Sequence, residues 1–423
     1  MWESLATNRR QDRVLHGAAK ALNVLVGMIA LPAWLIGQKL GGRLRRWLER
    51  AGSESAELPM PPQRERSMAA LMEDLEAVPG DLRPTPWAEP RKGLRDLSTF
   101  VLTQNRQGAV IGYAYPRQFF DHVFDGADGV GIAASVALHD SPRPGLVVVH
   151  GLFSTRRFDY VREIAVRAFY EWGFNVAAVD LRGFGLSGLM SEAPSSGGWK
   201  EGEDLVCVAE QLHVMGASSV GALGISLGAS SVLGASHADG CEALDGGVIA
   251  ISPPADVGQA TERLSRELPL KHPSYLLNYA FKAMLVSRVR GSRWPEDVRD
   301  LNQALNRVSG VYYGLSDEEI RFRSSAVNHI ARTRVPTLVL HPEDDRIIPV
   351  RHAHALARAA AGNDLVRVWV IPAGGHGAVD AVDERWAYAV YRRFFERWGD
   401  YAGGDREEMV YSAPADGKIE ASG

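Results

Sequence analysis

Short apolar runs alternate with longer amphipathic segments over most of the chain. Eight runs rich in β-branched residues have the length and flanking turns of buried strands. They lie at 99–102, 131–138, 145–149, 175–179, 219–223, 247–251, 337–340 and 366–371. Apolar residues at three-and-four spacing predict helices over 156–172, 202–213 and 383–398. Two leading strands followed by strand–helix–strand units predict an α/β domain with a mostly parallel eight-stranded sheet and helices on both faces.

Three segments differ in composition from this alternating region. Residues 21–37 carry no charge and reach the lower limit for a helix that spans a bilayer, with basic residues on both sides. We expect 1–50 to hold an apolar helix that either anchors the chain to a membrane or packs on its soluble body. Prolines punctuate 51–92 around one short helical stretch near 66–77, which predicts a linker. Residues 401–423 are small and polar, which predicts a disordered tail.

The bulk composition excludes several classes of function. The 423 residues carry a net charge of -4, with no basic tract of the kind that binds nucleic acid, so we expect no nucleic-acid partner. The only cysteines, Cys207 and Cys241, lack the spacing of a zinc site or a disulfide framework. Free thiols suit a reducing compartment, which favours the cytoplasmic side of the membrane. Phosphate-loop and metalloprotease motifs are absent from the sequence, so we expect no cofactor and no metal.

One serine stands in a setting that can activate its hydroxyl group. Gly224-Ile225-Ser226-Leu227-Gly228 directly follows a predicted strand, and small residues typical of a packed helix follow the motif. In such a strand–turn–helix, the flanking glycines allow a strained turn to lift the serine Oγ clear of the sheet. The same pattern also occurs in ordinary glycine-rich turns, so its meaning depends on a base and an acid elsewhere in the chain.

A base and an acid both follow strands later in the chain, in the order serine, acid, histidine. His376 lies between glycines directly after the run 366–371, where the backbone turns tightly. The loop after 337–340 carries three carboxylates, Glu343, Asp344 and Asp345. We predict Asp345 as the orienting acid and keep Asp344 as the alternative, because side chains in a tight turn alternate in direction. The acid is needed to fix the tautomer of the histidine and to stabilise its cationic form.

Hydrolysis through a serine also requires hydrogen-bond donors for the oxyanion. Leu227, the residue after the serine, is expected to supply one backbone N–H group. Leu152 in the loop after 145–149 is expected to supply the other, with Phe153 as the alternative. His150, which opens this loop, is interpreted as a residue that orders the turn.

These motifs resemble those of the α/β-hydrolase superfamily of serine hydrolases over roughly 97–400. The most similar subgroup contains the membrane-anchored α/β-hydrolase-domain lipases of eukaryotes and their bacterial YheT-type relatives. The strings that carry this resemblance are His150-Gly151-Leu152, Asp180-x-Arg182-Gly183, and Tyr312-Tyr313 through Ser324-Ser325 to Asp344-Asp345. The resemblance implies an α/β-hydrolase domain over 93–400, a Ser-Asp-His triad, ester or thioester hydrolysis, and often an N-terminal membrane segment.

The chain departs from this subgroup in three places that bear on the substrate, one of which is the region around 195–203, where it follows the family only loosely. Pro342 stands where the family usually has a glycine before the acid loop, and Ala229 stands where a further glycine is frequent. Residues about 254–326 fit the place where such enzymes insert a helical cap. The apolar residues of this segment either line an acyl pocket or form the core of the cap itself.

We therefore predict a serine hydrolase that cleaves carboxylic esters with a medium or long acyl chain through an acyl-enzyme on Ser226. Its partners would be a small-molecule acyl ester and, through the N-terminal segment, a membrane surface. An acyltransferase that uses the same acyl-enzyme and a non-catalytic scaffold on the same fold are the alternatives.

Overall fold

The computed structural model describes residues 67–82, 115–152, 154–265, 301–345 and 347–399. Four expected features lie outside the described residues: the apolar segment 21–37, the strand at 99–102, the middle of the cap and the C-terminal tail. Within the described ranges, no helix combines the length and the apolar character that crossing a membrane requires.

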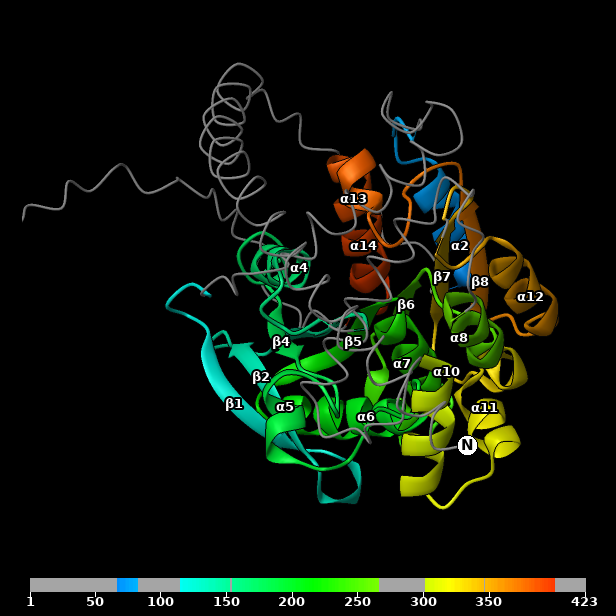
Figure 1. Cartoon of the computed structure of the whole chain (residues 1–423). Coiled ribbons are helices and arrows are strands. Elements are labelled where there is room, and N and C mark those ends of the chain that lie inside the picture. Colours follow the sequence, from blue (N-terminus) through cyan, green and yellow to red (C-terminus); the bar gives the residue numbers. More distant parts are fainter. Residues whose placement is uncertain (1–66, 83–114, 153, 266–300, 346, 400–423) are drawn as a thin grey trace, which may run out of the picture. The chain divides into compact units, whose positions relative to one another are not determined.

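Eight strands form one sheet in the order β1-β2-β4-β3-β5-β6-β7-β8 (Figure 1). Their bounds are β1 Phe120–Asp125, β2 Gly131–Ala137, β3 Arg143–Val149, β4 Asn175–Val179, β5 Ala217–Ile225, β6 Val248–Ile251, β7 Thr337–Pro342 and β8 Val366–Ile371. The β1–β2 and β2–β4 pairs are antiparallel, and all other pairs are parallel. The prediction of a mostly parallel eight-stranded α/β-hydrolase sheet is therefore confirmed.

The edge strand β1 was not predicted from the sequence. Its alternation of apolar and acidic residues is interrupted by His122, and Phe124 is its only buried side chain. An edge strand with one buried residue lacks the apolar run by which the inner strands are recognised. The other seven strands lie where the sequence places them.

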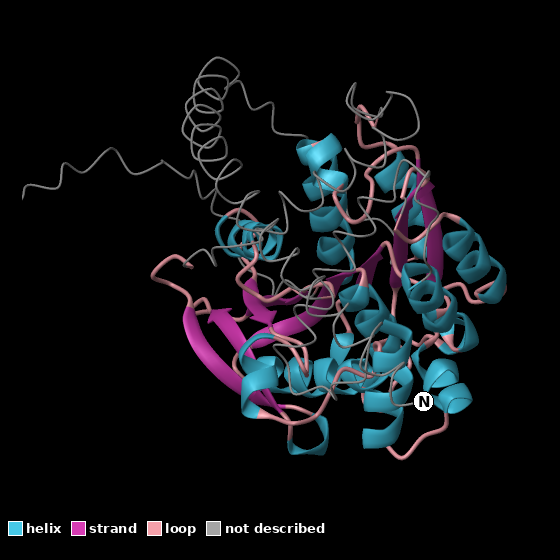
Figure 2. Ribbon diagram, in the orientation of Figure 1, coloured by secondary structure: helices cyan, strands magenta, loops and turns pink. Residues whose placement is uncertain are grey.

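Helices cover both faces of the sheet (Figure 2). The helices are α2 Met68–Glu76, α4 Asp159–Tyr170, α5 Gly185–Met190, α6 Trp199–Val214, α7 Leu227–Ala235, α8 Val257–Ser265, α10 Leu301–Gln303, α11 Asp317–Ser324, α12 Arg351–Ala359, α13 Val379–Val382 and α14 Glu384–Trp398. Successive side chains of β3 and β4 point into different cores, as the two-residue period of a strand requires. One core lies under α6, α7 and α12, and the other lies under α2, α4 and α14.

The short helix expected near 66–77 is present as α2, but it does not belong to a free linker. Ser67 caps its N-terminus by accepting the Ala70 N–H. Leu71 and Leu75 are fully buried in the core that α14 also lines. The Asp74 carboxylate forms an ion pair with Arg397 of α14. Residues 67–82 are therefore part of the hydrolase domain, which begins before the expected boundary at residue 93.

The described parts of the expected cap, 254–265 and 301–326, lie between β6 and β7 and are mostly helical. Three of their hydroxyl groups donate hydrogen bonds to consecutive carbonyl groups of the segment that leads into α6. Tyr313, Ser309 and Ser324 donate to Pro194, Ser195 and Ser196, respectively. Polar contacts therefore attach this part of the chain to the body of the domain.

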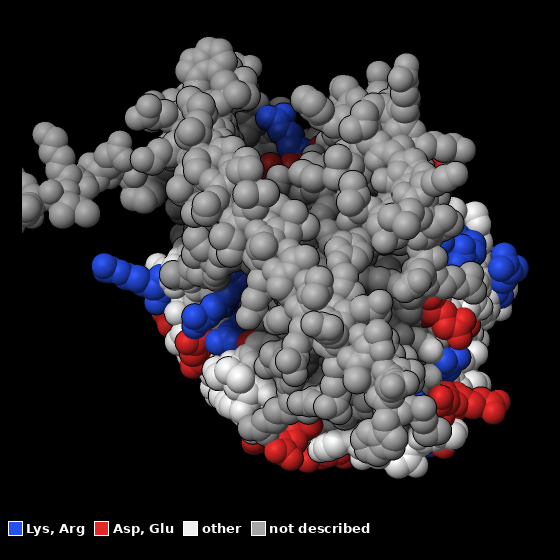
Figure 3. Space-filling view, viewed as in Figure 1, with Lys and Arg blue, Asp and Glu red and all other residues white. Residues whose placement is uncertain are grey.

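Charged side chains of both signs lie beside one another along the described margin of the face in Figure 3. One exposed ion pair within a single helix joins Arg323 to Glu319 of α11. Exposed pairs of this kind contribute about 0–1 kcal/mol each to stability. Larger electrostatic effects are expected only where a charge is buried.

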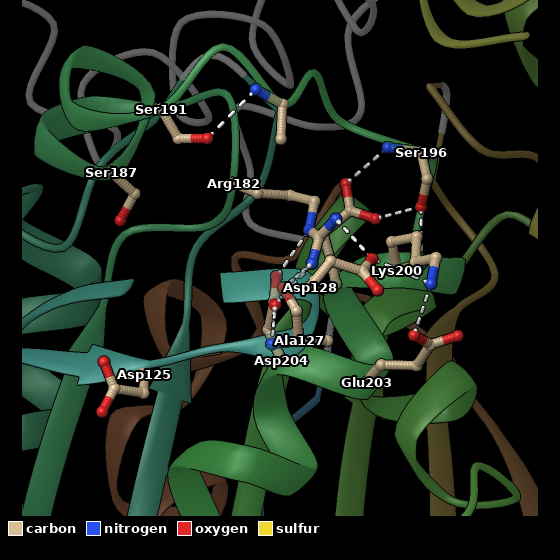
Figure 4. A network of polar contacts seen from close by, with 12 residues as sticks. Asp125, Ala127, Asp128, Arg182, Ser187, Ser191, Ser196, Lys200, Glu203 and Asp204 are labelled. Carbon is tan, nitrogen blue, oxygen red and sulfur yellow. Dashed lines mark hydrogen bonds and ion pairs between the residues drawn. The ribbon is translucent and has the colours of Figure 1, made fainter. Parts of the chain in front are cut away.

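Arg182 is such a buried charge and joins four parts of the fold (Figure 4). Its Nε and Nη2 donate to the two carboxylate oxygens of Asp204 on α6, each over 2.6 Å. Nη1 donates to the Tyr313 hydroxyl at 3.2 Å, and Nη2 also donates to the Ala127 carbonyl at 3.3 Å. Burial raises the pKa of Asp204 to about 6 despite the opposing effect of Arg182. The Arg182 guanidinium thus joins the loop after β4 to helix α6, to the Tyr313 segment and to the β1–β2 turn.

Replacing Arg182 by methionine should lower the free energy of unfolding by about 3–5 kcal/mol, because it leaves the Asp204 carboxylate buried without its cation. Urea unfolding of the parent and the variant measures this change. The double variant R182M/D204N should be more stable than R182M alone, since it removes the buried charge as well. An R182M variant within about 0.5 kcal/mol of the parent, the range of ordinary surface substitutions, would contradict this account.

Candidate active site

Ser226 occupies a sharp turn between β5 and α7. Its φ of 59° and ψ of -113° lie in a region that side-chain-bearing residues rarely adopt. A Cβ atom at Gly224 would lie 2.1 Å from the Gly228 carbonyl oxygen, and one at Gly228 would lie 2.6 Å from the carbonyl oxygen of Val149. Both glycines of the motif are therefore required, because strand, helix and the end of β3 approach too closely for a side chain.

The structure brings Ser226, His376 and Asp345 into one hydrogen-bonded chain. His376 Nε2 lies 2.9 Å from Ser226 Oγ, and His376 Nδ1 lies 2.9 Å from Asp345 Oδ2. A carboxylate only accepts hydrogen bonds, so Nδ1 carries the proton and Nε2 is free to accept the Ser226 hydroxyl. Ser226, Asp345 and His376 follow the parallel strands β5, β7 and β8, which place them at one edge of the sheet.

The two neighbouring aspartates of the β7 loop point in different directions. Asp345 is 3 % exposed, and its Oδ1 accepts the N–H groups of Ile347 and Ile348, each at 2.9 Å. These two bonds orient the carboxylate so that Oδ2 faces the histidine. Asp344 Oδ1 instead accepts the Gly375 N–H at 2.8 Å. The structure therefore places Asp345 against the imidazole, and Asp344 against the backbone of the histidine loop.

The loop after β3 lies directly beside the serine. A Cβ atom at Gly151 would lie 3.4 Å from Ser226 Cβ. The Gly151 N–H donates to the Tyr160 hydroxyl at 2.8 Å, and the Gly151 carbonyl accepts from His150 Nδ1 at 2.7 Å. Because the C=O and N–H of one trans peptide point in opposite directions, the Leu152 N–H points away from His150.

The other expected amide donor, Leu227, is the first residue of α7. The first N–H groups of a helix have no acceptor within it, and they lie at the positive end of the helix dipole. The alternative donor Phe153 lies outside the described residues.

His150 has the contacts of an ordering residue. Its Nε2 accepts the Leu181 N–H at 3.0 Å, which leaves the proton on Nδ1 for the Gly151 carbonyl. The ring is fully buried, and this burial lowers its pKa, so the imidazole is neutral near pH 7. Each nitrogen thus holds one backbone group of the loops after β3 and β4.

Sequence reasoning missed His341 and Ser252 at this edge of the sheet. His341 is fully buried at the end of β7, and its Nε2 donates to the Ile348 carbonyl at 2.8 Å. Burial lowers its pKa, so it places a neutral ring 3.8 Å from the Asp345 carboxylate. The position of both residues at strand ends was the available signal, but a strand end alone does not distinguish them from ordinary turn residues. Among the described residues, no three His, Cys, Asp or Glu side chains are grouped to hold a metal ion.

Solved structures that match this chain include proteins from three microorganisms. Esterase Pf2001 of Pyrococcus furiosus is 18% identical over 69% of this chain and 98% of its own, with a TM-score of 0.49. Est1E of Butyrivibrio proteoclasticus is 13% identical over 66% and 98%, with a TM-score of 0.43. A puromycin-hydrolyzing peptidase of Mycobacterium tuberculosis is 17% identical over 65% of this chain and 39% of its own, with a TM-score of 0.45.

A comparison with curated proteins finds no match. The sequence model of one protein family, described as serine aminopeptidase, S33, matches residues 140–380, which is more than half of the chain. This range contains Ser226, Asp345 and His376 in the order serine, acid, histidine. The chain therefore belongs to the serine aminopeptidase S33 family and is a serine hydrolase of the α/β-hydrolase fold.

Proposed function

We propose that the protein cleaves carboxylic esters through an acyl-enzyme on Ser226, with His376 as general base and Asp345 as its orienting acid. The observation that carries this proposal is the pair of 2.9 Å contacts that join Ser226 Oγ, the two ring nitrogens of His376 and Asp345 Oδ2. A serine hydroxyl is a weak nucleophile until a base takes its proton, and this arrangement supplies that base in the correct tautomer.

In the first half of the proposed reaction, Ser226 Oγ attacks the ester carbonyl carbon while His376 Nε2 takes the hydroxyl proton. The N–H groups of Leu152 and Leu227 stabilise the negative charge that develops on the carbonyl oxygen. The intermediate then collapses, the C–O bond to the leaving group breaks, and His376 donates its proton to the departing oxygen, which leaves as the alcohol. Asp345 stays ionised and stabilises the imidazolium throughout.

In the second half, His376 deprotonates a water molecule, which attacks the acyl carbon and releases the carboxylic acid. The proton returns from His376 to Ser226 Oγ. If an alcohol or amine replaces this water, the same acyl-enzyme gives acyl transfer. A product analysis with added alcohols distinguishes hydrolysis from transfer.

The family description makes peptide hydrolysis the second candidate. The same three residues could cleave an amide, but an amine leaves only after it is protonated, whereas an alcohol leaves more readily. The sequence resemblance to lipases favours an ester with a medium or long acyl chain. Turnover of p-nitrophenyl esters of increasing chain length, compared with aminoacyl p-nitroanilides, separates the two candidates.

The Ser226→Ala variant should lose both covalent labelling by a fluorophosphonate and at least about 10³-fold in kcat on p-nitrophenyl esters. The reason is that the acyl-enzyme cannot form without Oγ. In-gel fluorescence and steady-state kinetics measure the two effects. Labelling of the variant at the parental rate would show that a different nucleophile reacts.

The neighbouring aspartates provide a matched pair of variants. D345N should lower kcat by about 10³–10⁴-fold, because an amide NH₂ facing Nδ1 favours the wrong tautomer of His376. D344N should lower kcat by less than about 10-fold, since its amide oxygen can still accept the Gly375 N–H. Steady-state kinetics at pH 7 compares them. Equal losses, or a larger loss in D344N, would assign the acid to Asp344.

We also propose that residues 1–50 hold the protein at the cytoplasmic surface of a membrane. Deletion of residues 1–63 leaves α2 and its contacts with α14 in place. The full chain should then partition into the detergent phase of a Triton X-114 separation, while the shortened chain stays in the aqueous phase. Equal partition of the two would exclude the anchor.

A further inference from the structure

Ser252 is a second serine in a left-handed backbone conformation. In the described part of the chain, three residues other than glycine have a positive φ, namely Asp128, Ser226 and Ser252. Ser226 and Ser252 follow the adjacent parallel strands β5 and β6. Equivalent backbone bonds hold them: the Ser226 N–H donates to Ile251 O, and the Ser252 N–H donates to Leu340 O, each at 2.9 Å.

Glycine would adopt the backbone conformation at this position at a lower cost in free energy than serine does. Ser252 has a φ of 54°, which costs free energy for any residue with a Cβ. Pro253 follows it, and a residue before proline is restricted further to extended conformations. Strain of this kind persists where another interaction compensates for it, and often at functional sites. What a serine adds over a glycine here is its hydroxyl group.

That hydroxyl contacts the loop of the histidine. The Gly377 N–H donates to Ser252 Oγ at 3.3 Å, and Ser252 is fully buried. On the other side of His376, the Gly375 N–H donates to Asp344 Oδ1 at 2.8 Å. Side-chain oxygens from the ends of β6 and β7 therefore hold the amides of both neighbours of His376.

The histidine loop needs such support because its own sequence is very flexible. Gly374, Gly375 and Gly377 have φ angles of 151°, 55° and 70°, and glycine has the widest conformational freedom of all residues. A Cβ at Gly377 would lie 2.4 Å from Ile225 Cγ2, so a residue that stiffens the chain does not fit there. Within the loop the Ala378 N–H donates to the Gly374 carbonyl at 3.1 Å, and the contacts of Gly375 and Gly377 with side chains outside the loop add to this support.

We propose that Ser252 is a positioning residue for His376, whose hydroxyl fixes the Gly377 amide and thereby keeps the imidazole aligned between Ser226 and Asp345. This inference rests on the proposed function, because alignment affects the rate only if His376 is the base. Asp344 provides the corresponding contact on the Gly375 side. A displacement of about 1 Å at a catalytic group can cost about 10²-fold in rate.

The variants S252G and S252A separate positioning from stability. Both remove the hydroxyl, but S252G relieves the left-handed strain, whereas S252A keeps it. We expect both to lower kcat on p-nitrophenyl butyrate by about 10- to 100-fold with KM unchanged. S252G should have a Tm equal to or above that of the parent, and S252A a lower one. D128G is the matched control, because it relieves left-handed strain in the β1–β2 turn and should leave kcat unchanged.

A role in stability alone predicts a different result, in which kcat follows Tm. S252G would then be as active as the parent, and this outcome would overturn the inference while leaving the proposed function intact. If the parent itself turned over none of the esters and none of the p-nitroanilides, that result would instead contradict the proposed function.

The alignment of His376 can also be measured without turnover. A proton on Nδ1 that is shared with a buried carboxylate gives a low-field proton NMR signal, which is assigned by its absence in H376A. We expect this signal to shift or broaden in S252G and S252A, and to be unchanged in D128G. An identical signal in S252G and the parent would overturn the inference whether or not the protein turns over an ester.

Discussion

The close approach of the first turn of α7 to the ends of β3 and β5 is the constraint on which the site depends. The carbonyl oxygens of Val149 and His150 lie where a Cβ of Gly228 would have to be, and the Gly228 carbonyl lies where a Cβ of Gly224 would have to be. Ser226 can leave the sheet at its carboxyl edge only because both flanking positions are glycine. The same contact places the loop of Leu152 beside the serine. One packing arrangement thus brings together the proposed nucleophile, Ser226, and the proposed amide donors Leu152 and Leu227.

The other polar residues of the site follow strands on either side of β5. Each of them forms hydrogen bonds with backbone groups. Asp345 accepts two amides of its own loop, His150 joins the loops after β3 and β4, and Ser252 holds the loop after β8. None of these contacts is made through a flexible surface side chain. An active site built in this way is ordered before the substrate arrives, so binding energy is not spent on assembling it.

The sequence predicts the inner part of this fold well, because buried parallel strands have a distinctive apolar pattern. The proposed catalytic residues follow these strands in the order expected for such a sheet. It does not predict β1, because this edge strand buries only one side chain and therefore lacks an apolar run. It also does not decide between Asp344 and Asp345 as the partner of His376. Asp344 accepts the Gly375 N–H and Asp345 contacts His376 Nδ1, and both contacts are with a loop 31 positions away. Ser252 contacts a distant segment, and no local pattern marks it. Arg182 lies in a string that carries the family resemblance, but that string does not show which distant segments its guanidinium joins.

Helix α2 and helix α14 are near opposite ends of the described chain, yet they pack on each other and are joined by Asp74 and Arg397. This pairing has a consequence for synthesis on the ribosome. Helix α2 emerges from the ribosome before α14, but its docking surface is completed only when the last turn of α14 has left the exit tunnel. Until then, Leu71 and Leu75 have no partner on α14. Closure of the domain at this helix is therefore a late and long-range event in synthesis.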